Sequence, residues 1–399
     1  MKTAIAMLFA AAFAGATVAE ACTSWVIRPE LAESGMMIVQ KILDNPYRSR
    51  LDADIRVAPN GWRWIRVGSF GSGASMAMNE KGVAITTNCG DRNGEVRCHG
   101  GERHAMGCYE LVWQVKTCAT AEEAVDAIKN LARKRLFVFG DGKGRYGTIL
   151  LVADPRRAFL VEIGDGYAEA CEVTGGIHVV ANSWRLPGGE EFSEFDLPWL
   201  RGDRARKACT LRSLKEGKVN GKYTVRGCFD TSRAIRGGKF NQRFPFVPGS
   251  RKPKNMSLET TCFELDPEFT AFLSCAYISL GPQRHTVYLP VAMATRQLPD
   301  KMRDGRWAEM AYSHQEAFGP DHGDLEKITA LEDKFLAEFK AVREQARQLL
   351  REGKKDEAVN LLNDCFDRQY AEADKLMTVL YDAAGKRMKE LQEKSQKQP

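Results

Sequence analysis

The sequence predicts an α+β protein whose chain is strand-rich at first and helical at its C-terminal end. Between residues 23 and 181, short apolar or alternating runs typical of strands are separated by turn residues and by a helical stretch. From residue 324 onward, apolar residues recur every three or four positions, which is the spacing of amphipathic helices. We therefore expect one main α+β domain followed by a helical hairpin.

The N-terminal segment is typical of a secretory signal peptide. Lys2 supplies a positive charge, and residues 4–19 are apolar or small, a run too short for a comfortable membrane span. Ala19-Glu20-Ala21 has the small-x-small pattern at which signal peptidase cuts. We predict that residues 1–21 are removed on export to the periplasm or the extracellular space. Cys22 then becomes the first residue.

The elements that follow are predicted from their own local signals. Residues 22–44 contain two apolar runs around a turn and are typical of a β-hairpin. Asn79-Glu80-Lys81-Gly82 and Asp154-Pro155 mark turns between further strands. Thr120, with Glu123 three positions later, forms a capping-box pattern that predicts a helix start.

The C-terminal apolar pattern is interrupted at Gly353, so it predicts two helices joined by a short turn. We assign residues 22–295 to the main domain, 296–323 to a linker and 324–399 to the helical hairpin. Both helices carry charges of mixed sign, which disfavours a role at a membrane surface. The hairpin is expected to pack on the main domain or to pair with a second copy in a homo-oligomer.

Composition excludes several classes of function. The hydrophobic content of 44% and charged content of 28% are ordinary for a globular protein. The net charge of +6 comes from scattered Lys and Arg residues with no concentrated basic face, so no nucleic-acid partner is expected. After residue 21 no stretch is long and apolar enough to predict a membrane span.

Cysteine usage agrees with export. The chain has 11 cysteines, and an odd number in an exported protein predicts one free thiol with the others paired. If Cys22 is the free one, ten remain for as many as five disulfides, whose pairing is left open. The histidines at 99 and 104 lie near Cys98 and Cys108, but we interpret this segment as a disulfide-stabilised loop. No spacing resembles a paired CxxC zinc site, so no metal is predicted.

An N-terminal Cys22 would have its own α-amine beside the thiol. Such an amine has a reference pKa of roughly 7.7 to 8.0, so near neutral pH much of it is free to accept the thiol proton. This pairs a nucleophile with a base, as Cys and His are paired in other enzymes. The resulting chemistry is attack of a thiolate on an amide carbonyl, followed by hydrolysis of the thioester.

Several segments, taken in order, resemble a known family. Cys22-Thr23-Ser24-Trp25-Val26-Ile27 and Lys41-Ile42-Leu43-Asp44 resemble the opening of the N-terminal-nucleophile (Ntn) hydrolases of the choloylglycine hydrolase and penicillin V acylase group. Acyl-coenzyme A:isopenicillin N acyltransferases and cysteine dipeptidases share this opening. The segments 78–84 with Asn88, 178–183 with Asn182, and 204–208 resemble later family motifs. The resemblance covers roughly residues 22–214.

The resemblance implies a four-layer αββα sandwich with Cys22 as the nucleophile at the end of a central strand. It implies that Asp44 holds the α-amine, and that Asn88 and Asn182 divide the oxyanion and substrate or amine contacts. Arg204 would support the charge network. Lys41 stands where the family has arginine, which removes the forked contact but keeps the positive charge.

The predicted function is hydrolysis of a linear amide in a small-molecule substrate, with no metal or organic cofactor. An acyltransferase or a dipeptidase on the same scaffold is the first alternative. A secreted, disulfide-rich binding protein without catalysis is the second, and the lysine at position 41 is the feature that favours it. Cys22 itself has two other interpretations, a lipidated anchor and half of a disulfide.

Overall fold

Thirteen strands of the computed structural model form two antiparallel sheets. The structure describes residues 22–45, 50–69, 74–92, 111–133, 146–164, 167–187, 197–234, 256–319 and 322–396. The six-stranded sheet has the order β10-β1-β2-β11-β12-β13, with β1 Thr23–Ile27, β2 Met37–Asn45, β10 Ile177–Val180, β11 Met256–Leu265, β12 Cys275–Leu280 and β13 Leu289–Ala292. The seven-stranded sheet runs from β3 to β9 in chain order, with β3 Leu51–Val57, β4 Arg63–Ser69, β5 Met76–Asn79, β6 Ala84–Arg92, β7 Tyr146–Ala153, β8 Ala158–Gly164 and β9 Tyr167–Glu172.

The strand β1 lies inside the six-stranded sheet, between β10 and β2. All five of its residues are buried, as expected for a strand covered on both faces. Val26 packs between the two sheets, whereas Trp25 and Ile27 pack on the outer face. The predicted β-hairpin is confirmed, because β1 and β2 pair with Thr23 opposite Ile42.

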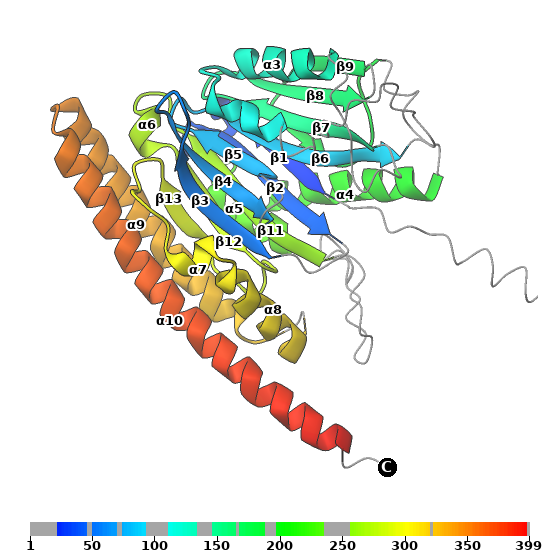
Figure 1. Cartoon of the computed structure of the whole chain (residues 1–399), viewed down its shortest axis with the longest axis vertical. Coiled ribbons are helices and arrows are strands. Elements are labelled where there is room, and N and C mark those ends of the chain that lie inside the picture. The colour runs from blue at the N-terminus through cyan, green and yellow to red at the C-terminus, as the bar shows by residue number, and fades with distance from the viewer. Residues whose placement is uncertain are drawn as a thin grey trace, which may run out of the picture.

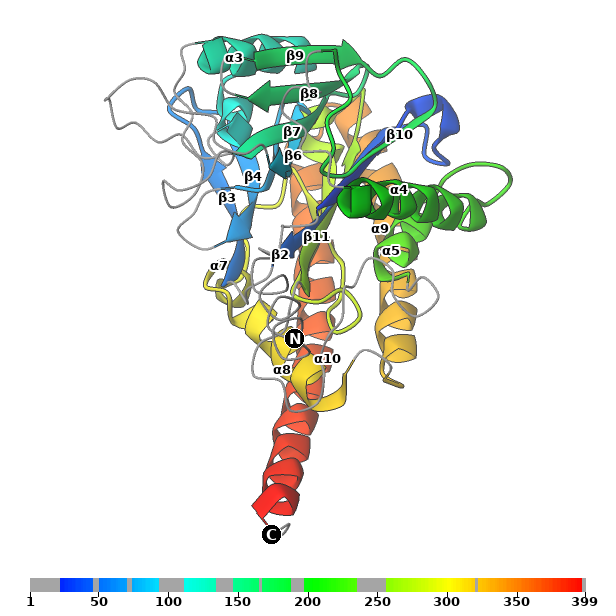
Figure 2. The same cartoon turned by 90° about the vertical axis from the view of Figure 1, so that its right-hand side faces the viewer.

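Helices cover the outer faces of both sheets (Figures 1 and 2). The helix α3, Ala121–Arg133, packs Ala124 and Ile128 against the outer face of the seven-stranded sheet. The helices α4, Leu197–Glu216, and α5, Val225–Arg233, lie over the six-stranded sheet together with the two C-terminal helices α9, Leu325–Arg351, and α10, Lys355–Gln396. A third apolar cluster fills the space between the sheets. The architecture is therefore helix, sheet, sheet, helix, which confirms the predicted αββα sandwich.

Two of the predicted local signals have the expected geometry. The Glu123 backbone N–H donates to Thr120 Oγ1 at 3.1 Å, so Thr120 caps α3. The Glu123 carboxylate accepts from the Ala119 N–H at 2.7 Å, one residue before the donor expected in a capping box. Gly82 has a φ of 82° in the turn before β6, a backbone conformation that glycine adopts without strain.

The C-terminal helices form part of the main fold. The helix α9 spans Leu325–Arg351 and α10 spans Lys355–Gln396. Phe339, Val342 and Leu362 pack in the cluster on the outer face of the six-stranded sheet. Burying side chains of this kind contributes roughly 1.5–3 kcal/mol each, which is large beside a net stability of about 5–15 kcal/mol. The C-terminal part of α10 projects beyond the rest of the molecule (Figure 1).

The segment predicted as a linker is largely helical. Residues 296–323 contain α7, Asp300–Arg303, and α8, Arg306–Phe318. Trp307 of α8 is buried and packs in the cluster between the sheets. Among the described helices, none is both long and apolar enough to cross a membrane.

A buried ion pair joins α9 to the sandwich. Arg233 at the end of α5 contacts Glu332 of α9 through both terminal nitrogens, each at 2.6 Å. The same carboxylate accepts from the Tyr288 backbone N–H at 2.8 Å. Charge-assisted contacts of this kind fix the orientation of a helix, because either partner left alone would be a buried charge without compensation.

The disulfide prediction is not met by the described cysteines. Seven of the ten expected to pair have free thiols: Cys118, Cys171, Cys209, Cys228, Cys262, Cys275 and Cys365. All except Cys171 are buried, and the core under α5 and α9 contains Cys228, Cys262 and Cys275 as small apolar side chains. The side chains of Cys89, Cys98 and Cys108 lie outside the described residues, as do residues 1–21 and both histidines of the 99–104 segment.

Candidate active site around Cys22

Cys22 lies directly before β1 and is buried, with 1% of its surface exposed. It belongs to the apolar cluster between the two sheets. Thr23, the first residue of β1, pairs with Ile42 of β2, so Cys22 and Asp44 both lie at this end of the strand pair. Asp44 accepts a hydrogen bond from Ser257 Oγ at 2.5 Å. The register thus brings the predicted nucleophile and the predicted amine-binding carboxylate to the same end of the sheet.

An arginine connects Cys22 with the second asparagine. Arg206 Nη1 donates to the Cys22 carbonyl oxygen at 3.0 Å, and Arg206 Nη2 donates to Asn182 Oδ1 at 3.0 Å. Asp203 in turn accepts from Arg206 Nη2 at 3.2 Å and from the Asn182 backbone N–H at 3.0 Å. The planar guanidinium holds both partners because its donors point in fixed directions.

Asp203 is the centre of this network. It is fully buried, and its second oxygen accepts a hydrogen bond from Ser183 Oγ. Two further cations, Arg185 and Lys207, each approach it to 3.6 Å. A buried carboxylate surrounded in this way fixes the start of α4 against the segment that follows β10.

The structure places Arg206 where the sequence predicted Arg204. Arg204 is exposed on α4. Asp203 and Arg206 are three positions apart and therefore share one face of the helix, the face turned toward Cys22. A helix position rotates by about 100° per residue, so Arg204 points elsewhere.

Lys41 and Asn88 meet between the two sheets. Lys41 is fully buried, and its Nζ donates to Asn88 Oδ1 at 3.1 Å and to the Thr87 carbonyl oxygen. Ser24 Oγ donates to the same Asn88 oxygen at 2.7 Å. Because Ser24 and Lys41 are opposite each other on β1 and β2, one asparagine on β6 is held by two neighbouring strands of the facing sheet.

The two asparagines have different surroundings. The Asn88 amide nitrogen donates to the Ala181 carbonyl oxygen at 3.0 Å, so both ends of its amide hold the fold together. Asn182 has its oxygen turned toward Arg206, which also holds the Cys22 carbonyl oxygen. Asn88 thus lies in the contacts between the sheets, whereas Asn182 lies in the network beside Cys22.

Glu259 is a buried carboxylate that the sequence did not single out. It lies on β11 opposite Leu43 and accepts a hydrogen bond from Ser75 Oγ. Burial raises its pKa to about 7, against the lowering effects of the Ser75 hydrogen bond and the Lys41 charge. Its neighbours come from three separated segments, and no spacing in the sequence signals the contact.

The Glu259 pKa predicts a change of stability with pH. An acid whose folded-state pKa is raised binds more protons when folded, so its stabilising effect is present below its unfolded pKa of about 4.3 and is lost as the pH rises through about 7. We expect Glu259→Gln to flatten this decline and to raise the free energy of unfolding at pH 8 by up to about 3 kcal/mol. Urea denaturation of wild type and Glu259→Gln between pH 4.5 and 8 measures the free energy of unfolding at each pH.

The exposed Glu169 provides the matched control, and Glu169→Gln should keep the wild-type slope. Glu162 also has a pKa raised by burial to about 7, so part of the slope should remain in the Glu259 variant. Equal slopes in Glu259→Gln and wild type would contradict the assignment.

A separate cavity of about 910 Å³ lies on the outer side of the six-stranded sheet. It is lined largely by charged side chains from the turn after η1 (Pro29–Leu31), from α5 and from α9, such as Glu33, Asp230 and Arg343. Its lining contains none of the predicted site residues. The candidate site is therefore defined by the hydrogen-bond network around Cys22.

Comparisons with known proteins give structural neighbours. No protein-family model and no curated protein sequence matches the chain. Two variants of conjugated bile acid hydrolase from Clostridium perfringens match with 11% and 9% identity, each with a TM-score of 0.45, over 68% of this chain and 91% and 92% of theirs. Penicillin V acylase from Agrobacterium tumefaciens matches with 13% identity and a TM-score of 0.37, over 65% of this chain and 86% of its own.

Proposed function

We propose that this chain is an exported hydrolase that cleaves a linear amide bond through a thioester on Cys22. The observation that carries the proposal is the contact of Arg206 with both the Cys22 carbonyl oxygen and Asn182 Oδ1. It joins the candidate nucleophile to a candidate oxyanion donor 160 positions away in the chain. A packing role alone would not require these polar groups to meet at one end of β1.

The reaction follows from the placement of these groups. Removal of residues 1–21 gives Cys22 an α-amine, which takes the thiol proton. The thiolate attacks the amide carbonyl, and the Asn182 NH2 group stabilises the oxyanion, a contribution worth roughly 3 kcal/mol per donor in other enzymes. The protonated amine gives its proton to the leaving amine, and water then hydrolyses the thioester.

The remaining polar groups of the site hold Cys22 and Asn182 in position or tune their charge. Asp44 stands beside the Cys22 end of β1, where it is suited to hold the protonated α-amine. Lys41 places a positive charge between the sheets and favours a thiolate over a thiol. Asp203 fixes Arg206, and Asn88 fixes the strand pair that carries Ser24 and Lys41.

Mass spectrometry of the exported protein tests the proposal. The intact mass should begin at Cys22 and should gain one rapid adduct with iodoacetamide under non-reducing conditions. The protein should then hydrolyse an amide in a panel that starts with a conjugated bile acid and penicillin V. A lipid adduct, a residue retained ahead of Cys22, or a Cys22 that does not react would refute the mechanism. Rapid alkylation with transfer to an added amine instead of water would identify an acyltransferase.

A further inference from the structure

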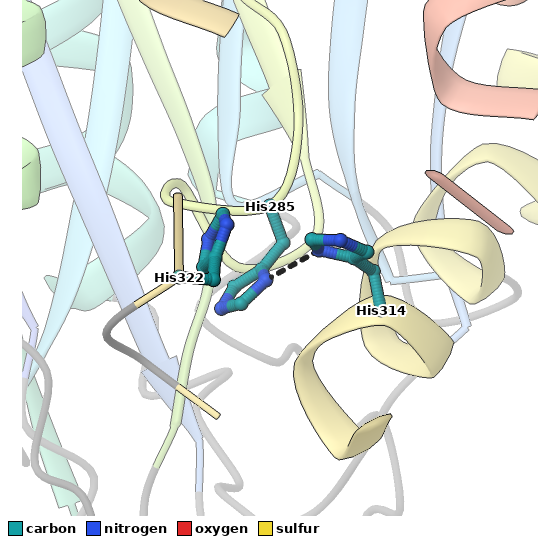
Figure 3. Close-up of side chains that lie close together, drawn as sticks. All are labelled: His285, His314 and His322. Atoms are coloured by element: carbon teal, nitrogen blue, oxygen red, sulfur yellow. Dashed lines mark hydrogen bonds between the residues drawn. The ribbon is translucent and has the colours of Figure 1, made fainter. Parts of the chain in front are cut away.

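Three histidines from separate elements gather away from Cys22, beside the helices that close the C-terminal end of the fold (Figure 3). His285 lies in the loop between β12 and β13, His314 lies on α8, and His322 lies just ahead of α9. Each offers a ring nitrogen, and the three nitrogens lie within 4.8 Å of one another. His285 and His314 are fully buried.

The ring contacts leave nitrogen atoms directed at each other. His285 Nδ1 and His314 Nδ1 are 2.9 Å apart (Figure 3). His285 Nε2, His314 Nε2 and His322 Nδ1 are buried and have no hydrogen-bond partner among the described residues. A buried polar atom without a partner costs about 1–3 kcal/mol, so three in one cluster call for a ligand.

Two ring nitrogens face groups of the kind that hold metal-bound histidines in place. His322 Nε2 lies 2.8 Å from the Arg284 carbonyl oxygen, and His314 Nε2 lies within ion-pair distance of Asp324 Oδ2, at 3.3 Å, although it is not hydrogen-bonded. In metal sites a carbonyl or a carboxylate holds the second ring nitrogen, which sets the tautomer and turns the first nitrogen toward the ion. In His322 the other nitrogen is the unpartnered Nδ1, and in His314 it is the Nδ1 that faces His285.

We propose that His285, His314 and His322 bind a divalent transition metal ion, with zinc the ion best matched to three imidazoles, and that Asp324 is a positioning residue for His314. Zinc–nitrogen bonds of about 2.0–2.1 Å at tetrahedral angles set ligand nitrogens about 3.3 Å apart. The 2.9 Å separation of two nitrogens and the 4.8 Å limit for all three differ from this by amounts that ring rotation can supply.

The contacts around the three histidines fix the loop that carries His285. Gly281 has a φ of 98°, and a Cβ there would lie 2.6 Å from the Ala311 Cβ, so the loop approaches α8 as closely as a glycine permits. Trp307 Nε1 donates to Thr286 Oγ1 at 3.0 Å, next to His285. The buried Arg233 donates to the Gln283 carbonyl oxygen at 2.6 Å. The loop that presents His285 is thus fixed on several sides. The bound ion would join the β12–β13 loop, α8 and the start of α9, and so act as a structural clamp.

Metal titration of the mature chain tests the proposal. After treatment with a chelator, the folded protein should take up one Zn²⁺ per chain and keep it through gel filtration, as measured by elemental analysis. Calorimetry should show that Asp324→Asn weakens Zn²⁺ binding by roughly 10–100-fold, and that His322→Gln weakens it at least as much. Co²⁺ in place of Zn²⁺ should give the intense visible bands of a tetrahedral nitrogen site. Excess Zn²⁺ should raise the melting temperature of wild type by several degrees.

His178→Gln is the matched control for His322→Gln. His178 lies on β10, outside the cluster, and is partly buried as His322 is, so the His178→Gln variant should bind Zn²⁺ as wild type does. Circular dichroism establishes whether each variant is folded. If His322→Gln does not fold, the Zn²⁺ affinity of Asp324→Asn alone decides whether the site exists. Folded wild type that retains no Zn²⁺, or binding equally strong in Asp324→Asn, His322→Gln and His178→Gln, would overturn the site. Activity is not needed for any of these measurements.

Discussion

Replacing Cys22 with alanine is expected to abolish amide hydrolysis, with kcat falling by a factor on the order of 10⁵. Removing the nucleophile of a covalent enzyme leaves only the contribution of binding and oxyanion contacts, and comparable losses are known for serine hydrolases. Cys22→Ser keeps the α-amine and a hydroxyl nucleophile, so it should lose less. Steady-state kinetics on the substrate identified from the amide panel provides the measurement.

The control for this variant is Cys171→Ala, which removes an exposed thiol on β9. It should leave kcat and KM unchanged, and Cys22→Ala should melt at a temperature close to that of wild type. Hydrolysis by Cys22→Ala at a rate near that of wild type would show that another group attacks the substrate.

Moving the chain start by one residue should have the second largest effect. In a chain that begins at Ala21, the nitrogen of Cys22 is part of a peptide bond and cannot act as a base. The α-amine then belongs to Ala21 and lies up to about 3.5 Å farther from the Cys22 thiol. General base catalysis contributes roughly 10²–10⁴-fold, so kcat/KM should fall by that factor. Chains that begin at Ala21 and at Cys22 are compared under identical conditions, with the iodoacetamide reaction rate as a second readout.

A chain that begins at Cys22 and carries one extra alanine after Pro399 serves as the control for altered length. It should match the unextended chain in both readouts. If the chain beginning at Ala21 is equally active, the α-amine is not the base, and activation by removal of residues 1–21 is excluded.

Much of the fold was predictable because local signals and packing agree. Strand alternation, the turns at Gly82 and Asp154, and the cap at Thr120 all describe elements that form. The helices of residues 324–399 were predicted from periodicity alone. Packing on the main domain was one of two expectations, and the sequence left the choice open, because the partners of Phe339 are distant strands and a pattern shows an apolar face without showing what covers it.

The site was predicted less evenly. The predicted residues Lys41 and Asn88 contact each other across the two sheets, and Cys22 precedes the strand that pairs with the strand of Lys41. Arg206, two positions after the predicted Arg204, contacts Cys22 and Asn182, because it shares a face of α4 with Asp203, and a run of basic residues does not reveal that face. Glu259 lacked any local signal.

The disulfide prediction and the histidine cluster illustrate one point, which is that spacing along the chain says little about distance in space. The cysteines were counted as disulfide partners, yet Cys228 and Cys262 lie buried as apolar side chains with free thiols. The histidine cluster combines positions 285, 314 and 322 from three elements, a separation that matches no metal-binding motif.

The interior position of β1 bears on how the chain reaches this structure. It pairs with β10 on one side and with β2 on the other, and β2 in turn pairs with β11, so completing the six-stranded sheet requires contacts between strands about 150 to 220 residues apart. Loop closure over such separations makes folding slow, and the sheet cannot assemble while its later strands are still being synthesised. The hairpin of β1 and β2 can form early, but the sheet around Cys22 remains incomplete until β10 and β11 have been synthesised. The site at the start of β1 is therefore assembled only late in folding.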